Sequence, residues 1–210
     1  MPDTTYDVLS AELDRQVDTL VRKGVPALLG LSEARLRERL EALREPLAEL
    51  PPRQHPDHVP FVVVVTGAPL DQAMPLVELR GKHGFTTMAA DDLKRFAPIE
   101  GLDLPAATPY LLVDVDTGGG TLNVTPDDAL PRIVGAGRSP LTVDEGVALV
   151  THHPELLRTH NAFSLLGSRC GDRRVTAIWV SAGRPRLGWC WAGNPHTWLG
   201  SASCAGRLGA

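Results

Sequence analysis

Residues 175–191 read VTAIWVSAGRPRLGWCW, and this stretch decides the class of fold. Its two runs, 175–180 and 186–191, are rich in β-branched and aromatic side chains, and a Ser-Ala-Gly-Arg-Pro turn separates them. This pattern predicts an antiparallel β-hairpin. Two further strands are expected upstream, at 61–65 and 110–115. The first is a continuous apolar run, which is typical of a strand covered on both faces.

Helical patterns dominate the first fifty residues. Apolar residues recur at helical spacing up to Gly24, which should end the first helix. A second helix is expected after the N-cap residue Ser32, with one apolar stripe formed by Leu36, Leu40, Leu43, Leu47 and Leu50. The two helices could pack as a hairpin on the rest of the chain or form the seam of a dimer. Further along, Pro126 and the capping box from Thr142 to Glu145 should open two more helices.

Together these patterns predict an α+β protein, or a few-stranded α/β one. We expect an N-terminal helical hairpin packed on a mixed β-sheet, with surrounding helices and a C-terminal β-hairpin. The helical layer would span residues 1–50 and the α+β body residues 59–210, within one compact domain. The linker between them, 51–58, is rich in proline and polar residues. It contains His55 and His58, which we expect to face solvent rather than to bind a metal.

Composition and charge exclude several kinds of partner. The net charge of −4 argues against nucleic acid, and the excess of Arg over Lys is typical of a GC-rich bacterial genome. No run approaches the roughly 20 apolar residues of a membrane span, and the first residues lack the basic start and apolar run of a signal peptide. An odd number of cysteines suggests free thiols or metal ligands rather than disulfides. We therefore expect a cytoplasmic monomer or homodimer.

The last fifth of the chain concentrates its reactive side chains. All four tryptophans and all three cysteines lie between Cys170 and Cys204. Residues 164–210 hold six arginines against one acid, whereas residues 1–163 hold 24 acids against 15 bases. Two interpretations are open: ion pairs join this basic segment to the acidic body, or the segment contains a site for an anion.

We predict a binding site for a small anionic or zwitterionic metabolite in this terminal segment. Arginines and loop amides would hold the anionic group, and tryptophans would form a stacking wall. Core packing is the alternative for the tryptophan face, whereas Gly188 should leave the opposite strand face open to close approach. The predicted substrate-binding residues are Arg169, Arg173, Arg186, Trp189, Trp191, Asn194, Trp198 and Ser201.

Two groups are candidates for catalysis. His196 is the only histidine of the terminal segment and could activate Cys204 as a nucleophile, or it could simply hydrogen-bond its loop. Asp114 and Asp116 lie on the same side at the end of an expected strand. They could move a proton or bind a metal, or they could form no more than a strand end with a turn.

A zinc site is a further possibility. Cys170, Cys190, His196 and Cys204 supply the ligand types of a Cys3His site, although their spacing includes no Cys-x-x-Cys pair. No other motif favours a cofactor.

Several phrases resemble an uncharacterised bacterial family, a domain of unknown function. They are GSRCGDRRV and GRPRLGWCWAGNPHTWLGSASC near the C-terminal end, YLLVDVDTG at 110–118 and RSPLT at 138–142. The resemblance covers nearly the whole chain, from the helix that contains DRQV at 14–17. It implies no particular reaction, fold or cofactor.

Function therefore stays open between two main classes, and a third, partner-binding class would use the apolar stripe from Leu36 to Leu50. The first is a metabolite-tailoring enzyme in which arginines and loop amides bind an anionic group, while His196 or the pair Asp114 and Asp116 moves a proton. The second is a non-catalytic protein that binds a metabolite, or one whose terminal segment is a zinc-stapled structural or interaction module.

Overall fold

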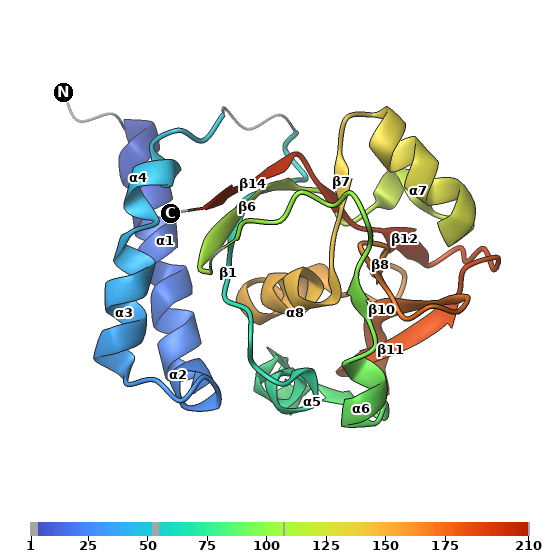
Figure 1. Ribbon diagram of the computed structural model, residues 1–210, viewed down its shortest axis with the longest axis horizontal. Helices are drawn as coiled ribbons and strands as arrows, with labels where there is room; N and C mark the ends of the chain where they lie inside the picture. The colour runs from blue at the N-terminus through green and yellow to red at the C-terminus, as the bar shows by residue number, and fades with distance from the viewer. Residues whose placement is uncertain (1–3, 52–54, 107, 210) are drawn as a thin grey trace.

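The computed structural model describes residues 4–51, 55–106 and 108–209. Its elements form layers around one central helix, α8 (Val143–His152) (Figure 1). A three-stranded sheet lies on one side of α8 and a five-stranded sheet on the other. The fold combines helices with one mixed sheet and several antiparallel sheets, which confirms the predicted α+β class.

The three-stranded sheet has the order β1 (Val59–Val64), β6 (Tyr110–Val115), β14 (Gly206–Gly209), with antiparallel neighbours. Both upstream strands expected from the sequence are therefore confirmed. All six residues of β6 are buried, because both faces of the sheet are covered. Val62, Val64 and Leu112 pack toward α8, whereas the alternate side chains of the same strands pack toward the N-terminal helices.

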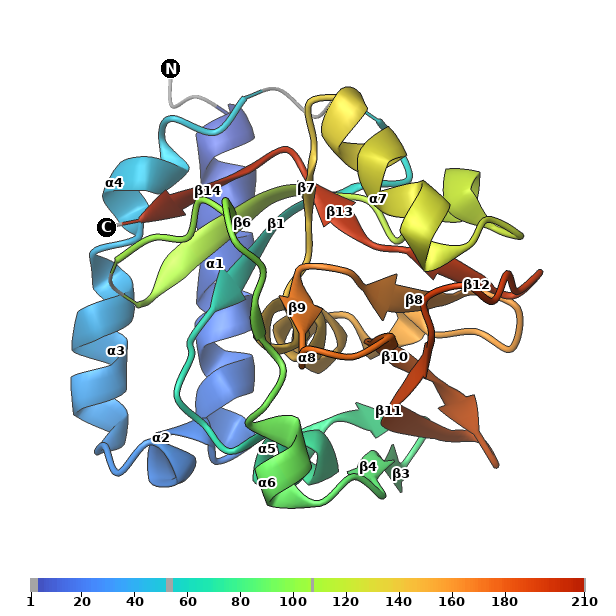
Figure 2. The ribbon, with the colours of Figure 1, turned by 45° about the vertical axis from the view of Figure 1, so that its right-hand side comes forward.

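The N-terminal helices cover the outer face of this sheet (Figures 1 and 2). They are α1 (Thr4–Arg22), α2 (Val25–Leu28), α3 (Glu33–Glu41) and α4 (Arg44–Leu47). Ser32 caps α3, since its side chain accepts a hydrogen bond from the Arg35 N–H. The expectation of one continuous helix up to Leu50 is wrong. Pro46 has no N–H to donate to the carbonyl of Ala42, so the chain breaks into α3 and α4.

The five-stranded sheet contains the predicted hairpin. Its order is β12 (Leu199–Ser201), β8 (Ala162–Leu165), β10 (Arg174–Ser181), β11 (Arg184–Trp191), β4 (Phe85–Thr86). The turn between β10 and β11 is tighter than expected: it consists of Ala182 and Gly183, both with positive φ, as a two-residue hairpin turn requires. The sheet is mixed, because β12 and β4 run parallel to their neighbours.

Shorter elements complete the fold. Helix α7 (Pro126–Gly135) packs against the face of the five-stranded sheet that points away from α8. Thr125 and Thr142 cap α7 and α8 as expected. No helix in the described part of the chain is both long and apolar enough to span a bilayer. The remaining short elements are α5 (Leu70–Ala73), α6 (Ala90–Leu93), β2 (Glu78–Leu79), β3 (Lys82–His83), β5 (Ala97–Pro98), β7 (Ser139–Pro140), β9 (Ser168–Arg169) and β13 (Ser203–Cys204).

A buried ion pair joins β14 to α8. The side chains of Arg207 and Glu145 are 3% and 0% exposed, and Arg207 Nη2 lies 2.9 Å from Glu145 Oε2. Glu145 also accepts hydrogen bonds from the Tyr110 hydroxyl and the Thr142 N–H. Each oxygen of this buried carboxylate thus has donors, which is the condition for a charge to remain in a protein core.

Replacing Arg207 with Met should lower the free energy of unfolding by about 3–5 kcal/mol, because Glu145 would keep a buried charge without a cation. Adding Glu145→Gln should recover most of the loss, since Gln is neutral and still offers an oxygen to Tyr110. Urea unfolding at pH 7 measures both variants. Arg35→Met, which breaks an exposed pair, is the control, with an expected change within about 0.5 kcal/mol. Equal losses in the single and double variants would contradict the explanation.

Candidate functional site

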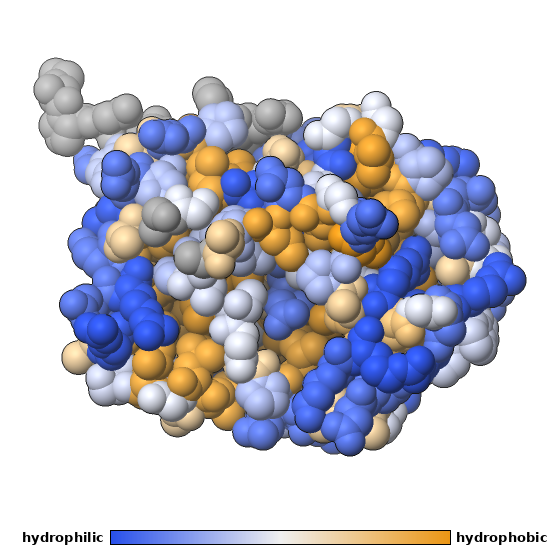
Figure 3. Space-filling view, in the orientation of Figure 1, coloured by the Kyte–Doolittle hydropathy of each residue, from blue (hydrophilic) through white to orange (hydrophobic). Residues whose placement is uncertain are grey.

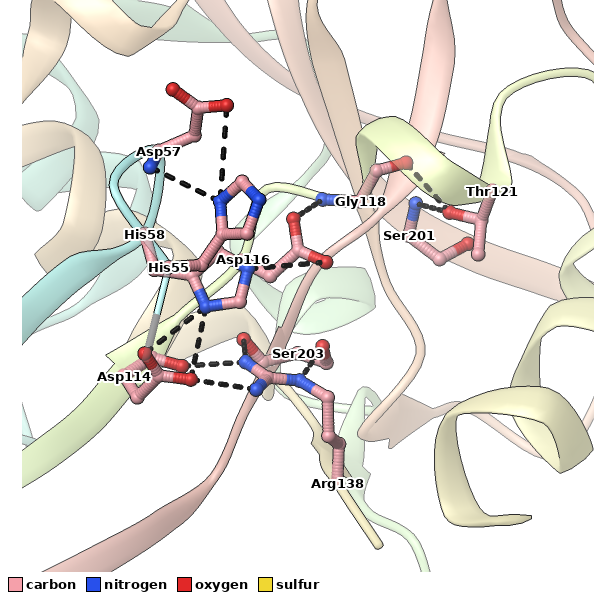
Figure 4. A network of polar contacts seen from close by, with 10 residues as sticks. All are labelled: His55, Asp57, His58, Asp114, Asp116, Gly118, Thr121, Arg138, Ser201 and Ser203. Carbon is pink, nitrogen blue, oxygen red and sulfur yellow. Dashed lines mark hydrogen bonds and ion pairs between the residues drawn. The ribbon is translucent and has the colours of Figure 1, made fainter. Parts of the chain in front are cut away.

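A network of polar side chains lies where β1 begins and β6 ends (Figure 4). The register pairs Val59 with Val115, so the residues just outside this pair, His58 and Asp116, lie opposite each other. Asp114, the penultimate residue of β6, contacts His58 as well. Antiparallel pairing therefore brings together three polar side chains from two distant parts of the sequence.

Asp114 is the buried centre of this network. Its φ of 49° is in the left-handed region, which is uncommon for a residue other than glycine, and its side chain is only 4% exposed. Arg138 Nη1 donates to Asp114 Oδ2 over 2.7 Å, and His58 Nδ1 lies 3.0 Å from both carboxylate oxygens. Strained backbone and converging donors at one residue are typical of functional sites.

The partners of Asp114 decide its charge. Burial by itself would raise the pKa of this carboxyl group, but the hydrogen bonds and charges of Arg138 and His58 outweigh burial. The pKa of Asp114 is consequently lower than usual. At neutral pH Asp114 is an ionised acceptor for both partners.

His58 lies between two carboxylates, as Figure 4 shows. Its Nδ1 faces Asp114, and its Nε2 lies 4.0 Å from Asp116 Oδ2. The side chain of His58 is 17% exposed, so the expectation that it faces solvent is wrong, whereas His55 is 54% exposed. Because ionised Asp114 can only accept, Nδ1 carries the proton of the neutral ring and Nε2 is the nitrogen that can accept one.

Backbone from the terminal segment completes the network. Arg138 Nε donates to Ser203 Oγ over 2.9 Å, and Asp116 and Ser203 form a β-bridge. Asp116 Oδ1 in turn accepts the N–H of Gly118, whose φ is 88°. A Cβ at Gly118 would lie 2.3 Å from the Ser201 nitrogen, so only glycine allows the loop after β6 to approach β12 this closely.

A polar cavity of about 630 Å³ opens beside His58. Besides the histidines and the aspartates, the lining includes a guanidinium, a carboxamide and two glycines without side chains over their backbone. The lining residues are His55, Asp57, His58, Asp116, Thr117, Gly119, Gly120, Arg158 and Asn161. The volume is in the range of small-molecule sites.

The predicted catalytic residues are only partly brought together. Asp116 lines the cavity, and Asp114 reaches it through His58. Cys204 is fully buried, and burial raises the pKa of its thiol to about 12, so the structure does not support a nucleophilic role. His196 packs against Trp198 with ring centroids 5.2 Å apart. Among the described residues no side chain is hydrogen-bonded to the His196 ring.

Several predicted binding residues are occupied within the fold. Arg173 pairs with Asp127 at 3.5 Å, and Arg186 Nη2 donates to Thr87 Oγ1 over 3.0 Å. Arg169 is half-buried on β9. Arg173 and Arg186 thus have partners within the fold, whereas Arg169 Nη1 and Arg186 Nε are buried without a hydrogen-bond partner among the described residues. None of the eight predicted substrate-binding residues lines the cavity beside His58.

The tryptophans do not form a stacking wall in a cavity. Trp189 and Trp191 are 38% and 47% exposed and contact each other edge to face, so the core-packing alternative is wrong for them as well. Trp198 packs against Trp179. The close approach expected at Gly188 is real, but the occupant is Trp179: a Cβ at Gly188 would lie 2.4 Å from that ring. Asn194 is exposed in the loop after β11, and Ser201 is buried in β12.

The proposed zinc ligands are not gathered. The described ranges contain no group of three His, Cys, Asp or Glu side chains placed to hold a metal ion. Cys170 Sγ instead contacts Asp172 at 3.1 Å, and Cys190 Sγ lies 3.7 Å from Ser164 Oγ.

Four side chains of the site were not singled out as site residues by sequence reasoning: His58, Arg138, Arg158 and Asn161. His58 had one usable signal, its position directly before the buried strand β1. The other three lie in connections between elements, where hydrophobic periodicity carries no information.

Comparison with known proteins gives a family and no function. The sequence has no significant match among curated proteins or solved structures. A family model described as "Family of unknown function (DUF5701)" matches residues 19–210, nearly the whole chain. The chain therefore belongs to this family of unknown function, DUF5701.

Proposed function

We propose that the protein is an acid–base enzyme acting on a small anionic or zwitterionic metabolite, with His58 as the group that moves the proton. The observation that carries the proposal is the placement of His58 between Asp114 and Asp116 at the wall of a polar cavity. The predicted class of function is kept, but its centre is His58 in place of His196.

Each residue of the network has a separate task. Arg138 keeps Asp114 ionised, and Asp114 holds the proton of His58 on Nδ1. Nε2 of His58 then accepts a proton from a substrate bound in the cavity and returns it later, as a positioned histidine does in general acid–base catalysis. Asp116, 33% exposed, borders both His58 and the cavity. It is placed to contact a polar or cationic group of the same substrate.

Other residues of the cavity lining supply the donors for an anionic group. Arg158 is exposed and presents a planar guanidinium suited to a carboxylate or phosphate. Asn161 provides an amide, and a substrate can approach the backbone of Gly119 and Gly120 closely, since a Cβ at either position would meet open space. A lining that holds both a carboxylate and a guanidinium favours a zwitterionic ligand.

Replacing His58 with Ala should abolish turnover, with a loss of about 10²–10⁴-fold in kcat/KM, because the proton would have no positioned acceptor. The assay incubates the purified chain with pooled phosphorylated and carboxylated metabolites and follows their consumption by mass spectrometry. His160→Ala, which removes an exposed histidine outside the cavity, is the matched control and should leave turnover unchanged.

Binding is measured separately from turnover. Substrates that are consumed should shift the amide resonances of Gly119 and Gly120, and Arg158→Gln should weaken their binding about tenfold or more, whereas Arg132→Gln on exposed α7 should not. Turnover that survives in His58→Ala would overturn the proposal. Binding at these amides without any turnover would select the non-catalytic alternative, a metabolite-binding protein.

The role of Asp114 as a fixed anion predicts a pH dependence of stability. A carboxyl group whose pKa is lowered on folding stabilises the native state above its unfolded pKa of 3.8, and this contribution is lost as pH falls through the lower folded pKa. Asp114→Asn removes the titration yet tolerates the positive φ. The free energy of unfolding should therefore rise more steeply with pH in the wild type than in the variant around pH 4 and below. If urea titrations gave the same pH dependence of the free energy of unfolding for the wild type and Asp114→Asn, the role of Asp114 as a fixed anion would be contradicted.

A further inference from the structure

A second group of cavities meets at one carboxylate, Asp144, on the second residue of α8. The larger cavity, about 600 Å³, and a neighbouring one of about 290 Å³ both have Asp144 in their lining. A narrow cavity of about 40 Å³ toward the N-terminal helices is also lined by Asp144. Pro98 separates the two larger spaces, since it lines both. None of these cavities shares a residue with the one beside His58.

The walls of the larger cavity are mainly apolar. They come from the loop after β1, from α5 and α6, and from the segment that follows α6. The larger apolar residues of the lining are Pro69, Leu70, Leu93, Phe96, Pro98 and Val143. Figure 3 shows hydrophobic side chains reaching the surface in the lower centre of this face, over the region where Figure 1 places α5 and α8. A mainly apolar space with a few charged groups in its wall is typical of a ligand site.

Within residues 4–51, 55–106 and 108–209, no cation forms an ion pair with Asp144. Among the described residues, no side chain donates a hydrogen bond to its carboxylate. The neighbouring Arg207 is held by Glu145, and Lys94, the cation that lines the larger cavity, is paired with Asp91 at 3.0 Å and is exposed. The only other acid in the lining, Asp71, adds negative charge.

We propose that this cavity binds a small organic amine, with its ammonium group on Asp144 and its apolar body between α5, α6 and the start of α8. The charge of Asp144 and the apolar walls of the cavity together favour such a ligand. A cation is required to pair with the carboxylate, and an apolar body is required to cover the side chains around it. The inference is independent of the function proposed for His58.

The electrostatics of the ligand-free site agree with this assignment. Burial raises the pKa of Asp144, and the charge of Glu145 raises it further, against the lowering effect of the helix N-terminal amide. A bound ammonium group supplies a positive charge next to the Asp144 carboxylate, where the described residues place no paired cation. Carboxylates and phosphates are excluded, since they would meet Asp144 and Asp71 with like charge.

The test titrates 15N-labelled protein with n-hexylamine and follows the amide resonances of Ala68, Val143 and Asp144 at pH 7. These resonances should shift and saturate, and hexan-1-ol and hexanoate, which share the chain but lack the cation, should bind at least about tenfold more weakly. Asp144→Asn should weaken hexylamine binding about ten- to a hundredfold, as expected for a charge-assisted hydrogen bond.

Asp127→Asn is the matched control, because Asp127 is the second residue of α7 just as Asp144 is of α8, and it lies at none of these cavities. It should bind hexylamine like the wild type. The spectrum of Asp144→Asn shows directly whether the variant is folded, and Asp144→Ser serves if it is not. Equal binding of hexylamine and hexan-1-ol, unchanged binding in a folded Asp144 variant, or shifts located elsewhere would overturn the proposal.

Discussion

The antiparallel register between β1 and β6 is the constraint on which the rest of the structure depends. A strand whose six residues are all buried needs a layer on each face and a partner on each edge. The N-terminal helices and α8 supply the two layers, and β1 and β14 supply the two edges. The same register places His58 opposite Asp116. The register of β1 on β6 therefore determines both the packing of the buried strands and the position of the polar site.

The outer edge of β1 shows how completely this sheet is enclosed. Gln16 of α1 is fully buried and takes the place of a further strand: its Oε1 accepts the Val63 N–H over 2.7 Å, and its Nε2 donates to the Phe61 carbonyl. His152 of α8 contacts the Val63 carbonyl through Nε2 at 3.0 Å. Side chains thus satisfy an edge that would otherwise be available for pairing with another chain.

Two buried acids acquire opposite roles from their partners. Burial raises the pKa of both Asp114 and Asp144, but only Asp114 has a guanidinium and an imidazole close enough to reverse the effect. Asp114 is therefore an internal counterion whose function is to orient His58. Asp144 has no comparable partner in the part of the chain that the structure describes, which is why its charge is relevant to a ligand.

Local patterns predicted the fold well because each depends on neighbouring residues. The β-branched runs became β1 and β6, the C-terminal hairpin formed in the expected region, and the capping residues began the expected helices. One helix was predicted too long, although Pro46 within it already argued against a continuous helix. The site was harder, because His58 and Asp114 are 56 positions apart and Arg138 lies 24 beyond Asp114. The register of β1 on β6 brings His58 and Asp114 together, and the pairing of β7 with β13 places Arg138 beside them.

The predicted site in the terminal segment, residues 164–210, differs from the observed cavity beside His58 for a physical reason. A high density of arginine, tryptophan and cysteine indicates side chains that are able to bind a ligand or to react. The fold can instead use these side chains for contacts with other residues of the same chain. Arg174 and Arg207 neutralise acids, and the cysteines are packed as small side chains. What the segment gives the site is mostly backbone: Ser203 bridges Asp116, and β12 fits against Gly118 where no Cβ intervenes. Backbone contacts of this kind cannot be recognised from the types of side chain in the sequence. The positions of cavities therefore locate the candidate sites better than the density of reactive residues does.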